Sequence, residues 1–164
     1  MSDFSKIEKE IKDSIFVKTQ MLNDQKLMKK INELVCSCVS CLKDGNKIIF
    51  FGNGGSFADA QHLSAEFTSR FLFERPALAS IALGTNNSGL SAMGNDYGYS
   101  KVFARELEAI GNEGDVCIAI STSGKSKNIK EALTKAKSKG IHPFALTGQS
   151  GGDLLNIASC ICVP

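Results

Sequence analysis

The stretch KIIFFGNGGS, residues 47–56, joins a short apolar run to a cluster of glycines, and it decides the fold. Four more apolar runs follow it, at 78–83, 115–121, 142–148 and 158–163. Each run is continuously apolar rather than alternating, which is typical of strands buried on both faces of a parallel sheet. Helices are expected between them, at 56–72, 99–110 and 126–139, with a short turn near 151–156. This alternation predicts a doubly wound α/β fold with a five-stranded parallel sheet.

Two helices are predicted ahead of the first strand. In residues 3–22 the apolar positions recur at helical spacing, and Asp24 is placed to cap a second helix that runs to about Lys43. Their mixed charged and apolar faces leave two alternatives open: packing on the sheet, or an oligomer interface. We expect one domain over residues 1–164, with the two helices in 1–44 and the α/β core in 45–164.

The composition is that of an ordinary globular protein. With 19 basic and 17 acidic residues the net charge is +2, and the lysines at 26–30 and 125–139 have no aromatic residues among them, so a nucleic-acid partner is disfavoured. The start is polar, unlike a signal peptide, and no stretch approaches the roughly 18 apolar residues of a membrane span. We expect a cytoplasmic protein without a membrane partner, whose six cysteines are reduced.

The glycine-rich loop at 50–56 is suited to a ligand. In an open parallel sheet, ligands bind beyond the carboxyl ends of the strands. Gly52, Gly54 and Gly55 allow close approach, and the helix that follows offers free N–H groups to an anion. A dinucleotide fingerprint would need glycine at Phe57. A nicotinamide cofactor is therefore not expected.

The second such loop, ISTSGKS at 120–126, is richer in hydroxyls. A P-loop would need glycine at Ala119, so nucleotide triphosphate hydrolysis is disfavoured. Hydroxyls and free N–H groups at the start of a helix suit a single phosphate group. An ordinary N-cap is the alternative for one serine, but four hydroxyls around one glycine favour phosphate. The four are Ser121, Thr122, Ser123 and Ser126.

Two further pairs carry weaker signals. His62 and Glu66 stand four residues apart and share one helix face, so they could ligate zinc or offer a base beside an acid. Their place after the glycine loop suggests that they lie near the same strand end. Asn95 and Asp96, in MGNDYGYS at 93–100, are expected in a loop that also reaches the strand ends, although Asn-Asp favours an ordinary turn by itself.

Taken together, these motifs resemble a known family. GNGGS, ADAQH-x-x-x-E, GND-[YF]-G and GDV-x-x-x-ISTSG-x-S, in this order and spacing, are similar to the phosphoheptose isomerases of the sugar isomerase (SIS) superfamily. The resemblance implies a flavodoxin-like sheet, a homotetramer, a zinc ion in each subunit and conversion of sedoheptulose 7-phosphate to D-glycero-D-manno-heptose 7-phosphate. That reaction serves bacterial lipopolysaccharide or capsule.

The resemblance also implies roles for single residues. His62 and Glu66 match the metal ligands, and Glu66 is also the implied base for proton transfer between C1 and C2. The family's remaining zinc ligands lie on a further helix, expected beyond Pro164, and Lys125 stands where the family usually has asparagine. Matching positions imply substrate contacts at Asn53, Gly54, Gly55, Ser56, Glu66, Asn95, Asp96, Ser121, Thr122, Ser123 and Ser126.

Two other classes of SIS protein remain as alternatives. One is a non-catalytic scaffold resembling the replication initiator-associating protein, which lacks a carboxylate at the position of Glu66. The other is a phosphosugar-sensing domain, which usually adds a DNA-binding segment. Because this chain has Glu66, the enzyme is the favoured interpretation.

Overall fold

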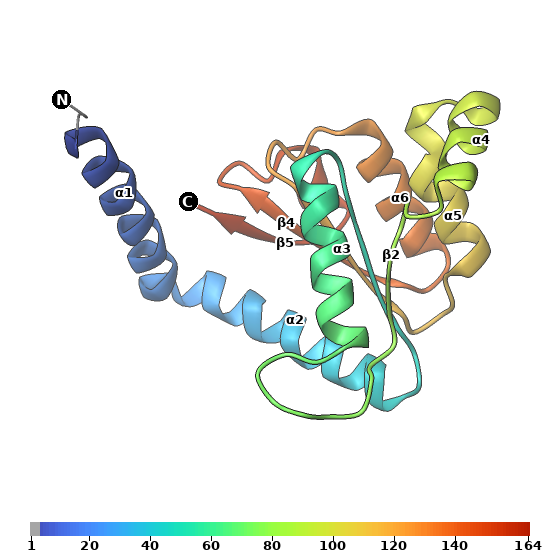
Figure 1. The fold of residues 1–164 in the computed structure, drawn as a ribbon, viewed down its shortest axis with the longest axis horizontal. Helices are drawn as coiled ribbons and strands as arrows, with labels where there is room; N and C mark the ends of the chain where they lie inside the picture. The colour runs from blue at the N-terminus through green and yellow to red at the C-terminus, as the bar shows by residue number, and fades with distance from the viewer. Residues whose placement is uncertain (1–3) are drawn as a thin grey trace.

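The computed structural model describes residues 4–164 and contains one sheet of five parallel strands (Figure 1). The strands are β1 (Ile48–Gly52), β2 (Ser80–Ala82), β3 (Val116–Ser121), β4 (His142–Gly148) and β5 (Ser159–Val163). Their order is β2-β1-β3-β4-β5, so the chain starts in the interior of the sheet and crosses over to build outward on both sides. This is the flavodoxin-like order, and the predicted fold class is confirmed.

Helices cover both faces of the sheet. Alternate residues of each strand point to opposite faces. Ile49 and Phe51 of β1 face a core completed by α5 and α6, whereas Ile48 and Phe50 face a second core completed by α2 and α3. The helices are α1 (Phe4–Asn23), α2 (Gln25–Lys43), α3 (Gly55–Thr68), α4 (Asn87–Tyr97), α5 (Val102–Ile110) and α6 (Lys127–Ser138), with short 3₁₀ turns η1 (Tyr99–Lys101) and η2 (Gly152–Asn156).

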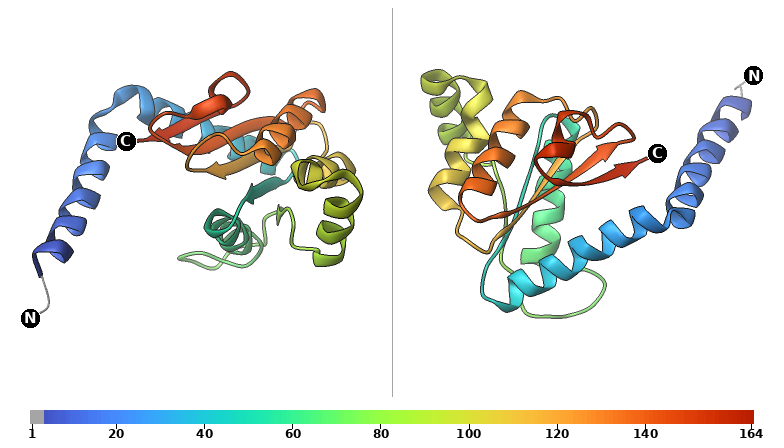
Figure 2. Two further views of the ribbon diagram at one scale, coloured as in Figure 1. Left: turned by 90° about the horizontal axis from the view of Figure 1, so that it is seen from above. Right: turned by 180° about the vertical axis from the view of Figure 1, so that it is seen from behind.

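The two leading helices behave differently. Asp24 caps α2 as predicted, because its carboxylate accepts hydrogen bonds from the Lys26 and Leu27 amides. Helix α2 packs on the sheet, and Lys30 Nζ donates to the Cys160 carbonyl oxygen at 3.1 Å. Helix α1 extends away from the sheet and buries none of its residues (Figures 1 and 2). A row of its apolar side chains is exposed: Phe4 (74%), Ile7 (56%), Ile11 (57%) and Ile15 (60%).

A buried carboxylate fixes the amino ends of β1 and β3. Asp115, just before β3, has no exposed surface, and its oxygens accept hydrogen bonds from Lys47 Nζ at 2.7 Å and the Lys47 amide at 3.0 Å. The Asn112 amide donates to the same carboxylate at 2.8 Å. A buried charge is tolerated when it is paired and hydrogen-bonded in this way. The register of the two central strands is therefore held at the edge opposite the predicted ligand loops.

Two predicted boundaries are wrong. The helix expected over 56–72 ends at Thr68, since the Arg75 guanidinium donates to the carbonyl oxygens of Glu66 and Phe67 in its last turn. The chain then runs without helix to β2. Asn95 and Asp96, expected in a loop, lie near the end of α4. Glycines and an Asn-Asp pair disfavour helix by propensity, and here the tertiary setting outweighs that preference.

All six cysteines are free thiols. Cys117 lies in the middle of the sheet, where burial raises the pKa of its thiol to about 12, and burial raises the pKa of Cys38 to about 11. Such thiols pack as small apolar groups. No helix among residues 4–164 has both the length and the apolar character of a membrane span.

Candidate phosphosugar site

The glycine loop connects the carboxyl end of β1 to α3. Gly52 has to be glycine, because a Cβ there would lie 2.6 Å from the Ser56 carbonyl oxygen in the first turn of α3. Gly54 occupies the N-cap position with φ +56°, where side chains are rarely accommodated, and it provides no side-chain cap. Gly55 and Ser56 form the first turn of the helix. The loop therefore packs closely against the helix at Gly52, and no side chain at Gly54 or Gly55 blocks the approach of a ligand.

The serine loop connects the carboxyl end of β3 to α6. Ser121 is buried at the end of the strand, whereas Thr122 and Ser123 are exposed in the turn. Ser126 is the N-cap residue of α6, yet its hydroxyl makes no capping hydrogen bond. The ordinary N-cap explanation for this serine is therefore not supported.

The charge around the serine loop is unusual for the start of a helix. The first turn of α6 contains no acidic residue, although carboxylates are favoured there. Instead Lys125 and Lys127 lie at or near it, and Lys127 is the first residue of the helix, whereas Lys130, one turn further on, is paired with Asp153 at 3.4 Å. Cations at the positive end of a helix are unfavourable without a neighbouring anion. This arrangement suits the binding of a phosphate group.

The two loops are joined by a residue that the sequence did not single out. Gly52 pairs with Ile120 in the sheet, so the loops leave neighbouring strands at the same edge. Asn53 Nδ2 donates to Asn128 Oδ1 at 2.9 Å, and Asn128 Nδ2 donates back to Asn53 Oδ1 at 2.8 Å. Tyr99 also donates its hydroxyl to Asn53 Oδ1, at 3.1 Å. In the sequence, Asn128 could have been noticed as a polar residue in the first turn of the helix that follows the serine loop.

The segment around Asn95 and Asp96 approaches this edge less directly. Both side chains are exposed, and Asn95 Nδ2 donates to Asp96 Oδ1 at 2.9 Å. Tyr99, three residues after Asp96, contacts the glycine loop through Asn53. At the end of β2, Glu106 Oε2 accepts a 2.6 Å hydrogen bond from the Gly84 amide, and burial raises the pKa of this carboxyl. Glu106 therefore fixes the turn at Gly84, from which the chain leads into α4 and to Asn95 and Asp96.

His62 and Glu66 form a pair, but in the middle and toward the far end of α3. His62 Nε2 donates to Glu66 Oε1 at 3.1 Å, as their spacing predicts. Ser64, between them, is hydrogen-bonded at 3.3 Å to Ser80, which pairs with Ile48 at the amino end of β1. Glu66 is eleven residues into the helix from Gly55, or roughly 16 Å along its axis at about 1.5 Å per residue. The predicted proximity of this pair to the glycine loop is wrong.

An apolar hollow of about 440 Å³ lies beside this pair. Its wall is formed by α3 and by the segment that follows it, where Phe71 and Phe73 are more than half exposed. Leu72, between them, has φ +61° and is 88% exposed. Such backbone geometry is uncommon for a leucine, and an apolar side chain held in solvent suits a contact with another molecule.

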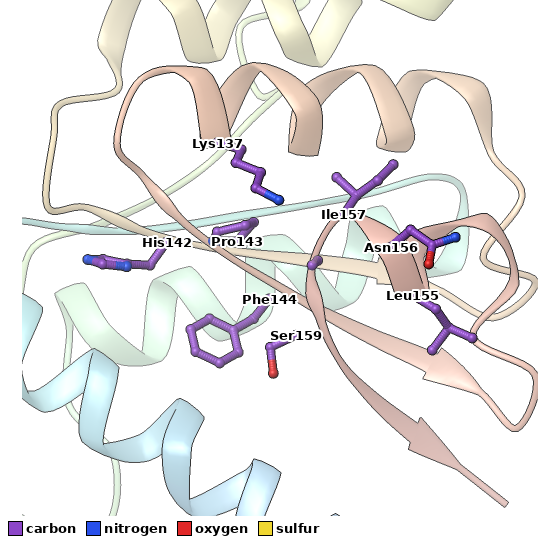
Figure 3. A pocket seen from close by; sticks show the side chains of 9 residues that line it. Lys137, His142, Pro143, Phe144, Leu155, Asn156, Ile157 and Ser159 are labelled. Carbon is purple, nitrogen blue, oxygen red and sulfur yellow. The ribbon is translucent and has the colours of Figure 1, made fainter.

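A second hollow, shown in Figure 3, is not part of the ligand edge. His142 and Ser159 line it, and they are the first residues of β4 and β5. It therefore opens at the amino ends of the strands. Ligands of open parallel sheets bind at the carboxyl ends, so we exclude this hollow as the phosphosugar site.

The strand order and the hydroxyl-rich loop agree with a SIS domain, and the SIS domain family model matches residues 16–148. The phosphoheptose isomerase of Aneurinibacillus thermoaerophilus is 48% identical over 100% of this chain and 82% of that protein. Phosphoheptose isomerase 2 of Campylobacter jejuni is 52% identical over 93% of this chain and 76% of that protein. The chain belongs to the phosphoheptose isomerase family.

The fold agrees with that membership. A solved structure of a phosphoheptose isomerase from Francisella tularensis superposes with a TM-score of 0.89 at 36% identity, covering 100% of this chain and 87% of that one. The predicted enzyme class, a sugar-phosphate isomerase, is therefore confirmed at the level of the family.

Proposed function

We propose that this chain converts sedoheptulose 7-phosphate to D-glycero-D-manno-heptose 7-phosphate in the cytoplasm, as a step toward the heptose of bacterial lipopolysaccharide or capsule. The observation that carries the proposal is the serine loop, a set of hydroxyls and lysines at a helix start whose N-cap serine does not cap the helix. The direct experiment is an assay of this conversion by the complete gene product. Absence of turnover together with absence of binding would exclude it.

The serine loop is proposed to hold the substrate phosphate. Ser121, Thr122, Ser123 and Ser126 offer hydroxyl donors, and the start of α6 adds backbone N–H groups. On the neighbouring strand, Asn53, Gly54, Gly55 and Ser56 line the approach to the same edge. Asn95 and Asp96 follow β2 and are proposed to contact the sugar hydroxyls. A phosphate fixed at one end holds the sugar still for reaction at the other.

Glu66 is proposed as the catalytic base. Interconversion of a ketose and an aldose requires removal of a proton from C1 and return of a proton to C2, while the hydroxyl proton moves from O1 to O2. A single carboxylate can perform both carbon transfers. The Glu66 side chain is 34% exposed and accepts a hydrogen bond from His62, so it is accessible to a sugar and oriented by its neighbour.

Within one chain, the serine loop and Glu66 lie at opposite ends of the central strands. Along the strands, the serine loop lies at the level of Gly52, and Glu66 lies beyond the level of Ile48. These two levels are about 13 Å apart, at about 3.3 Å per strand residue. An extended seven-carbon sugar phosphate measures roughly 10 Å, since each C–C bond is about 1.5 Å. We therefore propose that Glu66 of one subunit completes the serine loop of another.

A homotetramer is the proposed assembly. The exposed apolar row of α1 would be covered by further copies of the chain, as an amphipathic helix that buries none of its residues in its own subunit requires. Exposed Phe71, Leu72 and Phe73 beside the Glu66 hollow offer a second apolar contact. The leading helices (1–44) and the core (45–164) are proposed to form one SIS domain.

Zinc is proposed as the cofactor, with one ion per subunit. An imidazole and a carboxylate 3.1 Å apart are the right donor types for it, and both side chains are accessible. They fill two of the usual four positions, and residues 4–164 contain no group of three or more candidate ligands. Bound there, zinc would act as a Lewis acid toward sugar oxygens.

The zinc proposal predicts a difference between two chain lengths. We expect the 164-residue chain to retain little zinc after dialysis, and a chain that continues past Pro164 to retain about one ion per subunit, because two ligands are too few for a stable site. Elemental analysis of both chains, and of the longer one carrying His62→Ala, measures this. Equal stoichiometric zinc in both lengths would contradict the proposed ligand set.

The serine loop makes a second prediction. Replacing Ser121 and Ser123 with alanine should raise KM for sedoheptulose 7-phosphate more than tenfold, since hydrogen bonds to charged groups contribute about 1.5–3 kcal/mol each. Steady-state kinetics measures the effect. Ser138→Ala, an exposed hydroxyl at the other end of α6, is the matched control. An unchanged KM in the double variant would overturn this placement of the phosphate.

A further inference from the structure

The paired side chains of Asn53 and Asn128 form a reciprocal contact across the candidate site. Each carboxamide donates to the other, at 2.9 and 2.8 Å, and Asn128 is only 4% exposed. Asn128 Oδ1 also accepts the Ile129 amide at 3.0 Å, so it is fixed to its own helix. A buried carboxamide has to satisfy both donor and acceptor atoms, and this geometry meets that requirement with one partner.

The contact joins parts of the site that belong to different strand connections. Asn53 lies in the glycine loop after β1, and Asn128 lies in the first turn of α6 after the serine loop. Tyr99 brings a third segment to this contact, because its hydroxyl donates to the Asn53 carboxamide. In the same segment, Lys101 Nζ donates to Glu131 Oε2 of α6 at 2.9 Å. The side chains of Asn53, Asn128 and Tyr99 thus connect the glycine loop, the start of α6 and η1 at one edge of the sheet.

We propose that Asn128 is a positioning residue, which acts through Asn53 to fix the distance between the glycine loop and the serine loop. It contributes to binding a ligand that touches both loops, and not to binding a phosphate that touches the serine loop alone. The inference rests on the proposed function for its ligand, a phosphorylated sugar. Asn128 itself is buried and makes its hydrogen bonds to protein groups.

Two ligands of different size test the proposal in the complete gene product. Asn128→Ala removes both hydrogen bonds of the amide pair, which together correspond to about a tenfold change in affinity. We expect KM for sedoheptulose 7-phosphate to rise about tenfold with kcat changed by less than threefold. Inorganic phosphate, as a competitive inhibitor, should retain its inhibition constant within about twofold. Thr134→Ala, an exposed position on the same helix, is the control.

A double-mutant cycle distinguishes a role of Asn128 in positioning Asn53 from a role in stabilising α6 alone. If Asn128 acts through Asn53, adding Asn128→Ala to Asn53→Ala changes KM by less than twofold. Additive effects, or equal weakening of inorganic phosphate and of the sugar phosphate, would show that Asn128 only stabilises the helix. Tyr99→Phe, which removes one hydroxyl donor, should raise KM about threefold in the same direction.

Hydrogen exchange gives a readout that needs no ligand. Asn128→Ala should accelerate amide exchange in the segment 53–57 at least tenfold relative to Thr134→Ala, because the glycine loop loses its contact with α6. Unchanged exchange would overturn the proposal. If Asn128→Ala accelerates this exchange but the parent protein binds no sugar phosphate, the positioning role of the contact stands and the proposed function is excluded.

Discussion

Glu66→Gln is expected to lower kcat by about 10²–10⁴-fold, the usual contribution of general base catalysis. Glutamine keeps the size of the side chain and accepts the hydrogen bond that His62 Nε2 gives to Glu66 Oε1, but it has no basic carboxylate. Substrate should still bind, since the phosphate is held at the serine loop. The loss therefore falls on kcat, while KM stays within a few-fold of the parent value.

The measurement is steady-state turnover of the complete gene product, with substrate affinity determined separately by calorimetry. Glu74→Gln, an exposed glutamate paired with Arg70 in the segment after α3, is the matched control and should leave turnover unchanged. Turnover of Glu66→Gln within a few-fold of the parent would show that Glu66 is not the base. A protein that only binds phosphosugars would then be the better interpretation.

At substrate concentrations well below the raised KM of the serine-loop variant, mixed oligomers should recover activity from two variants that each turn over slowly alone. If Glu66 of one subunit completes the serine loop of another, a chain with Glu66→Gln can contribute an intact serine loop. A chain with Ser121→Ala and Ser123→Ala can contribute an intact Glu66. In oligomers assembled at random from equal amounts of both, about a quarter of the sites combine the two intact halves. We therefore expect about a quarter of the parent activity.

Co-expression of the two differently tagged chains and isolation of oligomers carrying both tags provide the sample. The separately purified variants, mixed without subunit exchange, are the control and should show only the low sum of their own activities. If the site lay within one chain, no mixed oligomer could contain an intact site. Co-assembled oligomers no more active than the control mixture would contradict the shared site.

The fold was largely predictable because its signals are local. The five apolar runs become the five strands, and Asp24 caps α2 where the sequence places it. The second strand is shorter than its apolar run, since β2 is an edge strand that pairs with β1 over three residues. The end of α3 was missed because Arg75, nine residues after Glu66, supplies the donors for its last carbonyl groups.

The site was predictable in its residue types and less so in its arrangement. Hydroxyls and glycines at strand ends indicated a phosphate loop, and the spacing of His62 and Glu66 predicted their mutual hydrogen bond. The distance between that pair and the loop follows from the length of α3 once its direction is known. The contact between Asn53 and Asn128 could not be read from the sequence, because the two positions are 75 residues apart and meet only in the folded sheet.

That separation has a consequence for the life of the protein in the cell. The edge that carries both asparagines is complete only after the ribosome has released residues 53 and 128 and β1 has paired with β3, so a partly made or partly opened chain lacks it. A ligand that binds the native state alone shifts the folding equilibrium by mass action. A phosphosugar bound at this edge would then also protect the chain against unfolding and against proteases that attack the unfolded state.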